Sequence, residues 1–457
     1  MPVPQEYLSV IRPKNTICKM IGNKCAVIQR IGCKRVNGKN IPINGPVIGH
    51  IIDGKYVEKK SKKLEVTLKN YADFIFADNI ANELLDDLKT VYGDEIAIKI
   101  YVISLLRAIN KGLCDYQIED AYESSYISET YKDISLNKST ISNFINDLGK
   151  DYSKILDFMH KRVEKIDEDD LVAIDGMLTA NNSKVNSLSD FSFKSKMKNS
   201  KEISQIVAFS IKKKEVICSL PYPGNTVDIV SFPDFIKKVG LKKGITLTDK
   251  AGADIADIGY IHPVKRNLKI LDELKLYDMN EKLESKENAI QCKKASFDGK
   301  FYYAYRDVRR ASIEKAVYMR SKKYRLATLN KKENKFGTVV YVSDQDISLD
   351  EAYKIYKQRR EIELVNKYYN NELCLNVREH DDFSVYGTQF LNMLSMIIGN
   401  KMKNRFEELG LFEKYTFGEL MNVLKRGKKV KDPRNSDFWL DTTQSKKGKE
   451  ILAKLGI

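Results

Sequence analysis

Hydrophobic and polar positions change their spacing several times along the chain, and each change predicts a different kind of element. Residues 17–66 hold short β-favouring pieces separated by the turn dipeptides Asn37-Gly38, Asn44-Gly45 and Asp53-Gly54, which are typical of hairpins. From 71 to 168 the apolar residues recur at helical spacing instead. The pattern therefore predicts a small β module followed by a helical module.

The stretch 139–149 of the helical module has the pattern of a single amphipathic helix. Ser139 is its predicted N-cap and Gly149 its predicted stop. Polar residues lie off the apolar stripe and could face DNA, as in a helix-turn-helix protein. An ordinary helix of a small bundle explains the same pattern, and the pattern by itself favours this second interpretation. The stripe is Ile141, Phe144, Ile145 and Leu148, and the polar residues are Thr140, Asn143 and Asn146.

Two candidate catalytic residues follow strands of an α/β segment that starts at 169. Leu171 to Asp175 reads as a buried strand that ends in a carboxylate, and 244–249 reads as another that ends in Asp249. A hairpin and a helix, 228–239, lie between these strands in sequence, and Gly240 is the predicted stop of the helix. The two strands can therefore lie side by side, and we expect their two aspartates at neighbouring strand ends.

A third carboxylate lies on a helix predicted from about Ser348, within its stretch from Tyr353 to Tyr369. A strand-rich stretch, 255–343, precedes it and looks like an insertion into the α/β core. At about 100° per residue, Glu363 shares one helix face with a base one turn before it and another one turn after it. An adjacent apolar stripe can dock this helix on the sheet, and it consists of Ile355, Ile362, Val365 and Tyr369. The polar face consists of Tyr356, Arg359, Glu363 and Lys367.

Two aspartates at adjacent strand ends and a glutamate on a helix packed across them suit one chemistry in particular. Mg²⁺ takes oxygen ligands in octahedral geometry, usually a few carboxylates together with substrate phosphate. Two such ions can activate water or a 3′-hydroxyl on one side of a phosphodiester and stabilise the leaving oxygen on the other. Any single Asp or Glu is more often a solvated surface group, so the inference depends on the three together.

Charge adds a candidate partner. The 457 residues include 78 Lys and Arg against 62 Asp and Glu, a net charge of +16. Residues 1–70 hold 14 basic and 4 acidic side chains, and residues 421–457 hold 10 and 4. A surplus of this size favours a polyanion such as nucleic acid, although a lysine-rich surface also serves solubility. The seven cysteines form no C-x-x-C pair, so neither a zinc site nor a disulfide framework is expected.

Several short motifs occur in a fixed order. Ala173-Ile174-Asp175-Gly176 and Thr246-Leu247-Thr248-Asp249 contain the two aspartates, with Pro223 to Asp228 between them. Tyr260 to Asn267 follows, and Tyr356 to Glu363 contains the glutamate. In this order the motifs resemble the insertion-sequence transposases of the DDE class, in the branch with the Y-x-x-R-x-x-x-E (YREK) signature. The resemblance covers roughly residues 170–400.

The resemblance implies an active DNA transposase with Asp175, Asp249 and Glu363 as catalytic metal ligands. The metal would be Mg²⁺, two ions in all, with Mn²⁺ as a substitute. Tyr356 and Arg359 would bind phosphate at the transposon end. The partners would be transposon-end and target DNA, bound by a homodimer in a synaptic complex. No apolar run is long enough to span a bilayer and no secretory signal is visible, so a cytoplasmic, nucleoid-associated protein is expected.

The expected architecture is α/β. A ribonuclease-H-like mixed-sheet catalytic core, implied by the resemblance, would occupy 169–384 and include the β-rich insertion at 255–343. A basic β-rich module, 1–70, and a helical, DNA-binding domain, 71–168, would precede it. A basic helical region, 385–457, would follow it.

The chain departs from the family pattern at three places. Asn370 stands where the signature has a lysine, and Lys367 is the candidate substitute. Arg360 stands where many relatives have tryptophan, and Asp249 is followed by Lys-Ala-Gly rather than by Arg-Gly-Phe. Two other functions therefore stay open. One is a retired, transposase-derived DNA-binding protein, and the other is a structure-specific nuclease on the same core.

Overall fold

The computed structural model divides the chain into two compact units, and each is described by itself. The first comprises residues 1–67 and 431–438, and the second comprises 68–430 and 439–457. The described residues are 2–36, 39–59, 66–195, 199–248, 258–283, 290–375, 380–432, 438–442 and 444–457.

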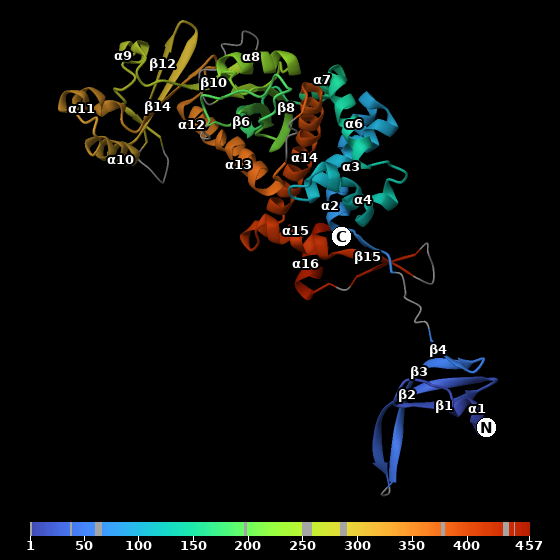
Figure 1. Cartoon of the computed structure of the whole chain (residues 1–457). Coiled ribbons are helices and arrows are strands. Elements are labelled where there is room, and N and C mark those ends of the chain that lie inside the picture. The colour runs from blue at the N-terminus through green and yellow to red at the C-terminus, as the bar shows by residue number, and fades with distance from the viewer. Residues whose placement is uncertain are drawn as a thin grey trace. The chain divides into compact units, whose positions relative to one another are not determined.

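The first unit is built on a four-stranded antiparallel sheet in the order β1-β2-β3-β4 (Figure 1). Cys25, Val27 and Ile51 form its small buried core. The predicted hairpin turn at Asp53-Gly54 is confirmed, since both residues have positive φ between β3 and β4. Its elements are α1 Gln5–Leu8, β1 Thr16–Ile21, β2 Lys24–Val36, β3 Lys39–Ile52 and β4 Lys55–Glu58.

The turn predicted at Asn44-Gly45 is wrong. Both residues lie inside β3, where the pairing with β2 changes register between Ile28 and Arg30. A β-bulge accommodates Asn and Gly without reversing the chain, so the dipeptide marks an irregularity of a long strand. The dipeptide Asn37-Gly38 lies outside the described residues.

The second unit begins with a helical bundle, as the apolar spacing predicts. Asn137, not Ser139, caps α6, because its side chain accepts the backbone N–H of Thr140 at 2.9 Å. The helix also runs through Gly149 to Lys150. The bundle comprises α2 Ala72–Tyr92, α3 Asp94–Ile109, α4 Ile118–Ser124, α5 Ile127–Thr130, α6 Lys138–Lys150 and α7 Tyr152–Glu164.

A nine-stranded mixed sheet forms the rest of the core, so the chain is a mixed α/β protein. Its order is β11-β12-β13-β14-β10-β9-β6-β7-β8. Strands β6, β7 and β8 are antiparallel neighbours, whereas β6, β9 and β10 run parallel. The strands are β6 Leu171–Ala180, β7 Glu202–Ser210, β8 Glu215–Pro223, β9 Ile245–Leu247, β10 Gly259–Val264, β11 Glu281–Lys282, β12 Ile290–Phe297, β13 Lys300–Asp307 and β14 Thr338–Ser343.

The strand-rich stretch 255–343, which the sequence predicts as an insertion, belongs to the same sheet as the two aspartate strands. Its strands β10 and β14 pair with each other and β10 pairs with β9, so the sheet continues without a break. The elements between β10 and β14 extend it at one edge and add α10 and α11 (Figure 1). The helices in this stretch are α9 Lys269–Glu273, α10 Val308–Met319 and α11 Leu326–Lys332.

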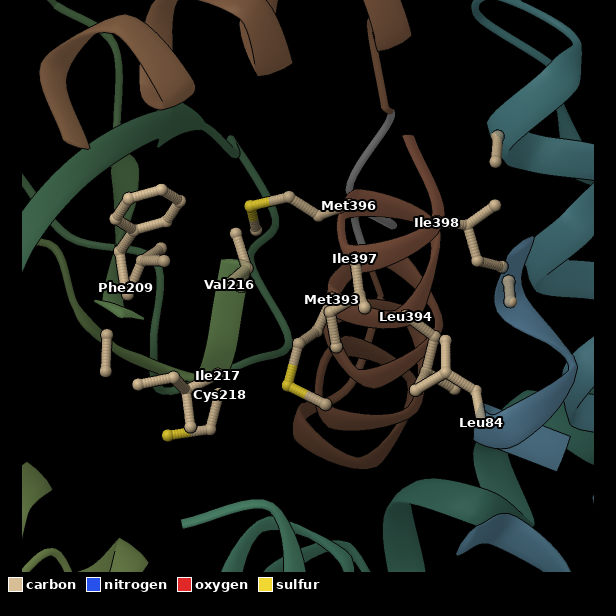
Figure 2. Close-up of a cluster of buried hydrophobic side chains, with 14 of the residues drawn as sticks. Leu84, Phe209, Val216, Ile217, Cys218, Met393, Leu394, Met396, Ile397 and Ile398 are labelled. Atoms are coloured by element: carbon tan, nitrogen blue, oxygen red, sulfur yellow. The ribbon is translucent and has the colours of Figure 1, made fainter. Parts of the chain in front are cut away.

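A long helix, α14 (Asp382–Glu408), lies between the sheet and the bundle (Figure 1). Figure 2 shows Met393 and Met396 directed toward β7 and β8, and Leu394 directed toward Leu84 of α2. The helix is buried on every side from Gly387 to Asn400, because one face covers strands and the opposite face covers helices. Polar side chains such as Asn392 and Ser395 are buried there together with the apolar ones. The stretch from 385 onward thus begins inside a core helix.

The remaining helices and strands complete the second unit. The predicted stop at Gly240 is confirmed, since this glycine caps α8 in the left-handed conformation. Within the described part of the chain, no helix is both long and apolar enough to cross a membrane. The elements are β5 Leu68–Asn70, α8 Asp228–Val239, α12 Leu349–Gln358, α13 Arg360–Tyr368, α15 Phe417–Arg426, β15 Lys428–Lys431, β16 Trp439–Asp441 and α16 Lys446–Leu455.

Candidate active site

The predicted side-by-side arrangement of the two aspartate strands is confirmed. Strands β6 and β9 pair in parallel, with Val172 opposite Thr246 and Ala173 opposite Leu247. The last paired residues therefore precede Asp175 and Asp249 by two positions each. Asp249 itself lies outside the described residues, so its place beside Asp175 stays a prediction.

Asp175 does not end its strand, which corrects the sequence interpretation. Strand β6 continues to Ala180 and stays paired with β7 over this length. What ends near Asp175 is the pairing with the shorter β9. Because β9 stops at Leu247, the edge of β6 that faces it has no paired β9 residue from Ile174 onward among the described residues. Asp175 thus lies where a long strand emerges beside a short one.

The two faces of β6 at this point are covered by different helices. Successive side chains of a strand point to opposite faces. Asp175 faces α13, since Asn366 of that helix donates a hydrogen bond from Nδ2 to Asp175 Oδ2 at 2.8 Å. Gly176 faces α8, because a Cβ added there would lie 3.9 Å from Asp228 Oδ1. Asp228, which is paired with Lys194, therefore belongs to the opposite side of the sheet.

The expected single helix from Tyr353 to Tyr369 is divided in two. The predicted start at about Ser348 is confirmed, since Ser348 caps the first part, α12, by accepting the backbone N–H of Glu351 at 3.2 Å. The helix ends at Gln358, and α13 begins at Arg360. Ile355 and Ile362 are buried on either side of the break, which confirms that this face docks on the core. Glu363 is therefore presented by a short separate helix that contacts β6.

Glu363 is the most accessible of the described candidate ligands, with 52% of its side chain exposed. Arg359 donates to its Oε1 from one guanidinium nitrogen at 2.5 Å. Lys357, Arg359, Arg360 and Glu363 line one surface pocket of about 530 Å³. Three of these four side chains are cationic, so the pocket suits an anion such as a phosphate group.

The other predicted phosphate-binding residues are placed less fully. Lys367 is exposed on α13, one turn after Glu363. Tyr356 falls within α12, and its side chain lies outside the described part of the structure. Among the described residues, no group of three or more His, Cys, Asp or Glu side chains is gathered as a metal cluster. The proposed trio cannot appear there, because Asp249 is not among them.

Sequence reasoning missed Asn366, although its position carried a signal. It follows Glu363 by three residues, and side chains three apart on a helix lie about 5–6 Å from each other at Cβ. Its contact with Asp175 therefore brings the Glu363 turn of α13 next to the first aspartate. The helix that carries Glu363 is thus held against the strand that carries Asp175 by Asn366.

Comparison with known proteins adds little to this geometry. No protein-family model matches the chain, and no curated protein matches it. Among solved structures, the chain is similar to a piggyBac transposase in its synaptic complex with hairpin DNA. The TM-score is 0.41 with 11% identity, over 79% of this chain and 82% of that one. A likeness at this level does not define a shared fold, so the function must be argued from the site itself.

Proposed function

We propose that the chain is a DDE DNA transposase of the insertion-sequence type, with a ribonuclease-H-like catalytic core. The observation that carries the proposal is the docking of α13 on β6, which sets the Glu363 turn beside Asp175 through the 2.8 Å bond from Asn366. The parallel register of β6 and β9, which ends two residues before each aspartate, supports Asp249 as the third ligand. An antiparallel trio of strands continued by two parallel ones supports the ribonuclease-H-like core.

The donor set fits Mg²⁺. Asp175, Asp249 and Glu363 offer carboxylate oxygens, and the buried Asn366 Oδ1 beside Asp175 has no hydrogen-bond partner among the described residues. Hard oxygen donors of this kind are the ones that Mg²⁺ and Mn²⁺ take. Bound there as a pair, the ions would activate water or a 3′-hydroxyl and stabilise the leaving oxygen of a phosphodiester.

The protein's own part in the reaction is to hold the DNA strand against the carboxylates. Arg359, Arg360, Lys357 and Lys367 present positive charge around Glu363 and would bind the phosphates that flank the reacting one. Tyr356 would contribute a further phosphate contact, as the family resemblance implies. A phosphate bound to the Arg359 guanidinium would compete with Glu363 for it, and the Glu363 carboxylate would then be free to hold a metal ion. DNA binding and metal binding would then be coupled at this one side chain.

A second basic surface supports DNA as the partner. Residues 308–335, which contain α10 and α11, hold 10 Lys and Arg against 2 Asp and Glu. Arg320, Lys322, Lys323 and Arg325 are exposed between the two helices. Such a cluster favours contact with a phosphate backbone, and its contribution would weaken as salt rises. As parts of the same proposal, the protein would work in the cytoplasm, associated with the nucleoid. It would act as a homodimer that holds two transposon ends together.

The proposal is tested with linear DNA that carries the inverted repeats flanking this gene. Wild type and Asp175→Asn are compared with Mg²⁺ and with EDTA, and binding is measured on the same DNA. Cleavage at the repeat ends that requires Mg²⁺ and falls at least about 100-fold in the variant, with binding retained, supports the transposase. Binding without cleavage in either protein would replace it by the retired DNA-binding protein. Preference for a branched junction over the repeat ends would replace it by the structure-specific nuclease.

A further inference from the structure

One buried side chain of the proposed site has a polar atom that the described structure leaves unsatisfied. Asn366 is 8% exposed, and its Oδ1 has no hydrogen-bond partner among the described residues. A buried carbonyl oxygen without a partner destabilises the fold, because it has given up its hydrogen bonds to water and gained none. Such a group is retained at a functional site more readily than in a core, because there a ligand can satisfy it.

The nitrogen of the same amide is engaged by Asp175. Nδ2 donates to Asp175 Oδ2 at 2.8 Å, while the backbone N–H of Gly176 donates to Asp175 Oδ1 at 2.9 Å. The two bonds fix the orientation of the carboxylate before any ligand arrives. The amide nitrogen of Asn366 thus binds Asp175, a proposed metal ligand. The oxygen of the same planar amide has no hydrogen-bond partner among the described residues and lies next to Asp175.

We propose that Asn366 belongs to the metal site, where its amide nitrogen orients the Asp175 carboxylate and its Oδ1 is a further oxygen donor for the cation. This inference rests on the proposed function, because it presupposes that Asp175 binds a divalent metal. A carbonyl oxygen is a hard donor of the kind that suits Mg²⁺ and Mn²⁺. It also adds an oxygen donor without adding a negative charge. A fourth carboxylate would increase the repulsion among the carboxylates before metal binds.

The test measures metal binding on the full chain without DNA, so that activity is not the readout. Mn²⁺ is titrated and the free ion is followed by electron paramagnetic resonance for wild type, Asp175→Asn, Asn366→Ala and Asn400→Ala. Asn400 is the matched control, since it is 1% exposed on α14 and its Oδ1 also has no partner among the described residues. We expect Asn366→Ala to weaken Mn²⁺ binding about 10-fold and Asn400→Ala to leave it unchanged.

The outcomes separate the two proposals. If Asp175→Asn abolishes Mn²⁺ binding but Asn366→Ala binds like wild type, the role of Asn366 is wrong and the metal site stands. If wild type and Asp175→Asn bind Mn²⁺ equally, the metal site itself is wrong and the role of Asn366 falls with it. Equal weakening in the two asparagine variants would also overturn the inference, because a general loss of packing would then explain it.

A second variant excludes a purely structural explanation. Asn366→Asp keeps the size and an oxygen donor but loses the N–H and adds a charge beside Asp175. Without metal its melting temperature should fall below that of wild type, because two carboxylates then face each other. With saturating Mn²⁺ its melting temperature should rise by more than that of wild type, because the ion binds the folded state and relieves the repulsion. A melting temperature of Asn366→Asp that Mn²⁺ does not raise would contradict the donor role.

Discussion

Arg359 and Glu363 form an ion pair of 2.5 Å across the point where α12 ends and α13 begins. The guanidinium side chain is 18% exposed and the carboxylate side chain is 52% exposed, so the arginine is held in place while the glutamate remains open to solvent. Two residues to which the family resemblance assigns different ligands, phosphate and metal, therefore bind each other in the chain without DNA.

Replacing Arg359 should affect metal and DNA in opposite directions. In Arg359→Gln, Glu363 loses its competing partner, and we expect Mn²⁺ affinity without DNA to rise by up to about fivefold, since exposed ion pairs contribute about 0.2–1 kcal/mol. Affinity for repeat-end DNA should fall in the same variant. Arg405→Gln is the control, because Arg405 pairs with Glu408 on an exposed turn of α14. A parallel loss of both affinities would contradict competition at Glu363.

The glycines at the crossing of α6 and α14 should be sensitive to a single added methyl group. A Cβ at Gly149 would collide with the carbonyl oxygen of Phe383, and one at Gly387 would collide with that of Ile145. We expect each Gly→Ala change to lower the free energy of unfolding, measured by urea denaturation, by about 1–3 kcal/mol. Gly418 of α15 has open space around its Cβ position, so Gly418→Ala should be neutral or stabilising. Equal behaviour of the three variants would rule out a close helix crossing.

The same helix crossing bears on the two interpretations of α6, since it engages one of the polar residues that could face DNA. Asn146 donates to both carboxylate oxygens of Asp381 at 3.0 and 3.1 Å and to Ser384 Oγ, whereas Asn143 is exposed. We expect Asn146→Ala to lower stability by about 1.5–3 kcal/mol, because its partner is charged. We expect Asn143→Ala to leave both stability and DNA affinity unchanged. A clear loss of DNA affinity in Asn143→Ala would revive the helix-turn-helix interpretation.

Acid should weaken the contact that holds α10 to the sheet. Burial by itself would raise the pKa of Glu314, but hydrogen bonds from Arg266, the Gly337 N–H and Arg310 outweigh it and lower the pKa to about 2. Since the pKa in the unfolded chain is about 4.3, the stabilisation is complete above that pH and is lost as pH falls toward 2.

The measurement compares melting temperatures of wild type and Glu314→Gln from pH 7 to pH 2.5. The difference between the two proteins should be constant above about pH 5 and should shrink below about pH 4.5. Glu273→Gln, on an exposed position of α9, is the matched control and should show no such trend. A difference that persists unchanged to pH 2.5 would show that the carboxylate charge of Glu314 is not what stabilises the fold.

Local patterns in the sequence were enough for several elements and for one long-range contact. The helix start at about Ser348, the stop at Gly240 and the turn at Asp53-Gly54 depend on neighbouring residues alone, and all three are confirmed. The pairing of β6 with β9 also followed, because an antiparallel hairpin and one helix between two strands leave few ways to arrange them. The order of the motifs around Asp175, Asp249 and Glu363 was likewise read from the sequence alone.

Only the tertiary structure decided the contacts between elements that are distant in sequence. The sequence pattern predicted Gly149 as a helix stop. In the structure α6 continues through Gly149, and the close approach of α14 leaves no room for a side chain at this position. The break between α12 and α13 and the bond from Asn366 to Asp175 likewise depend on how a helix packs on a strand 191 positions away. A sequence pattern records which face of an element is apolar, but the partner that this face meets is set by packing of the whole chain.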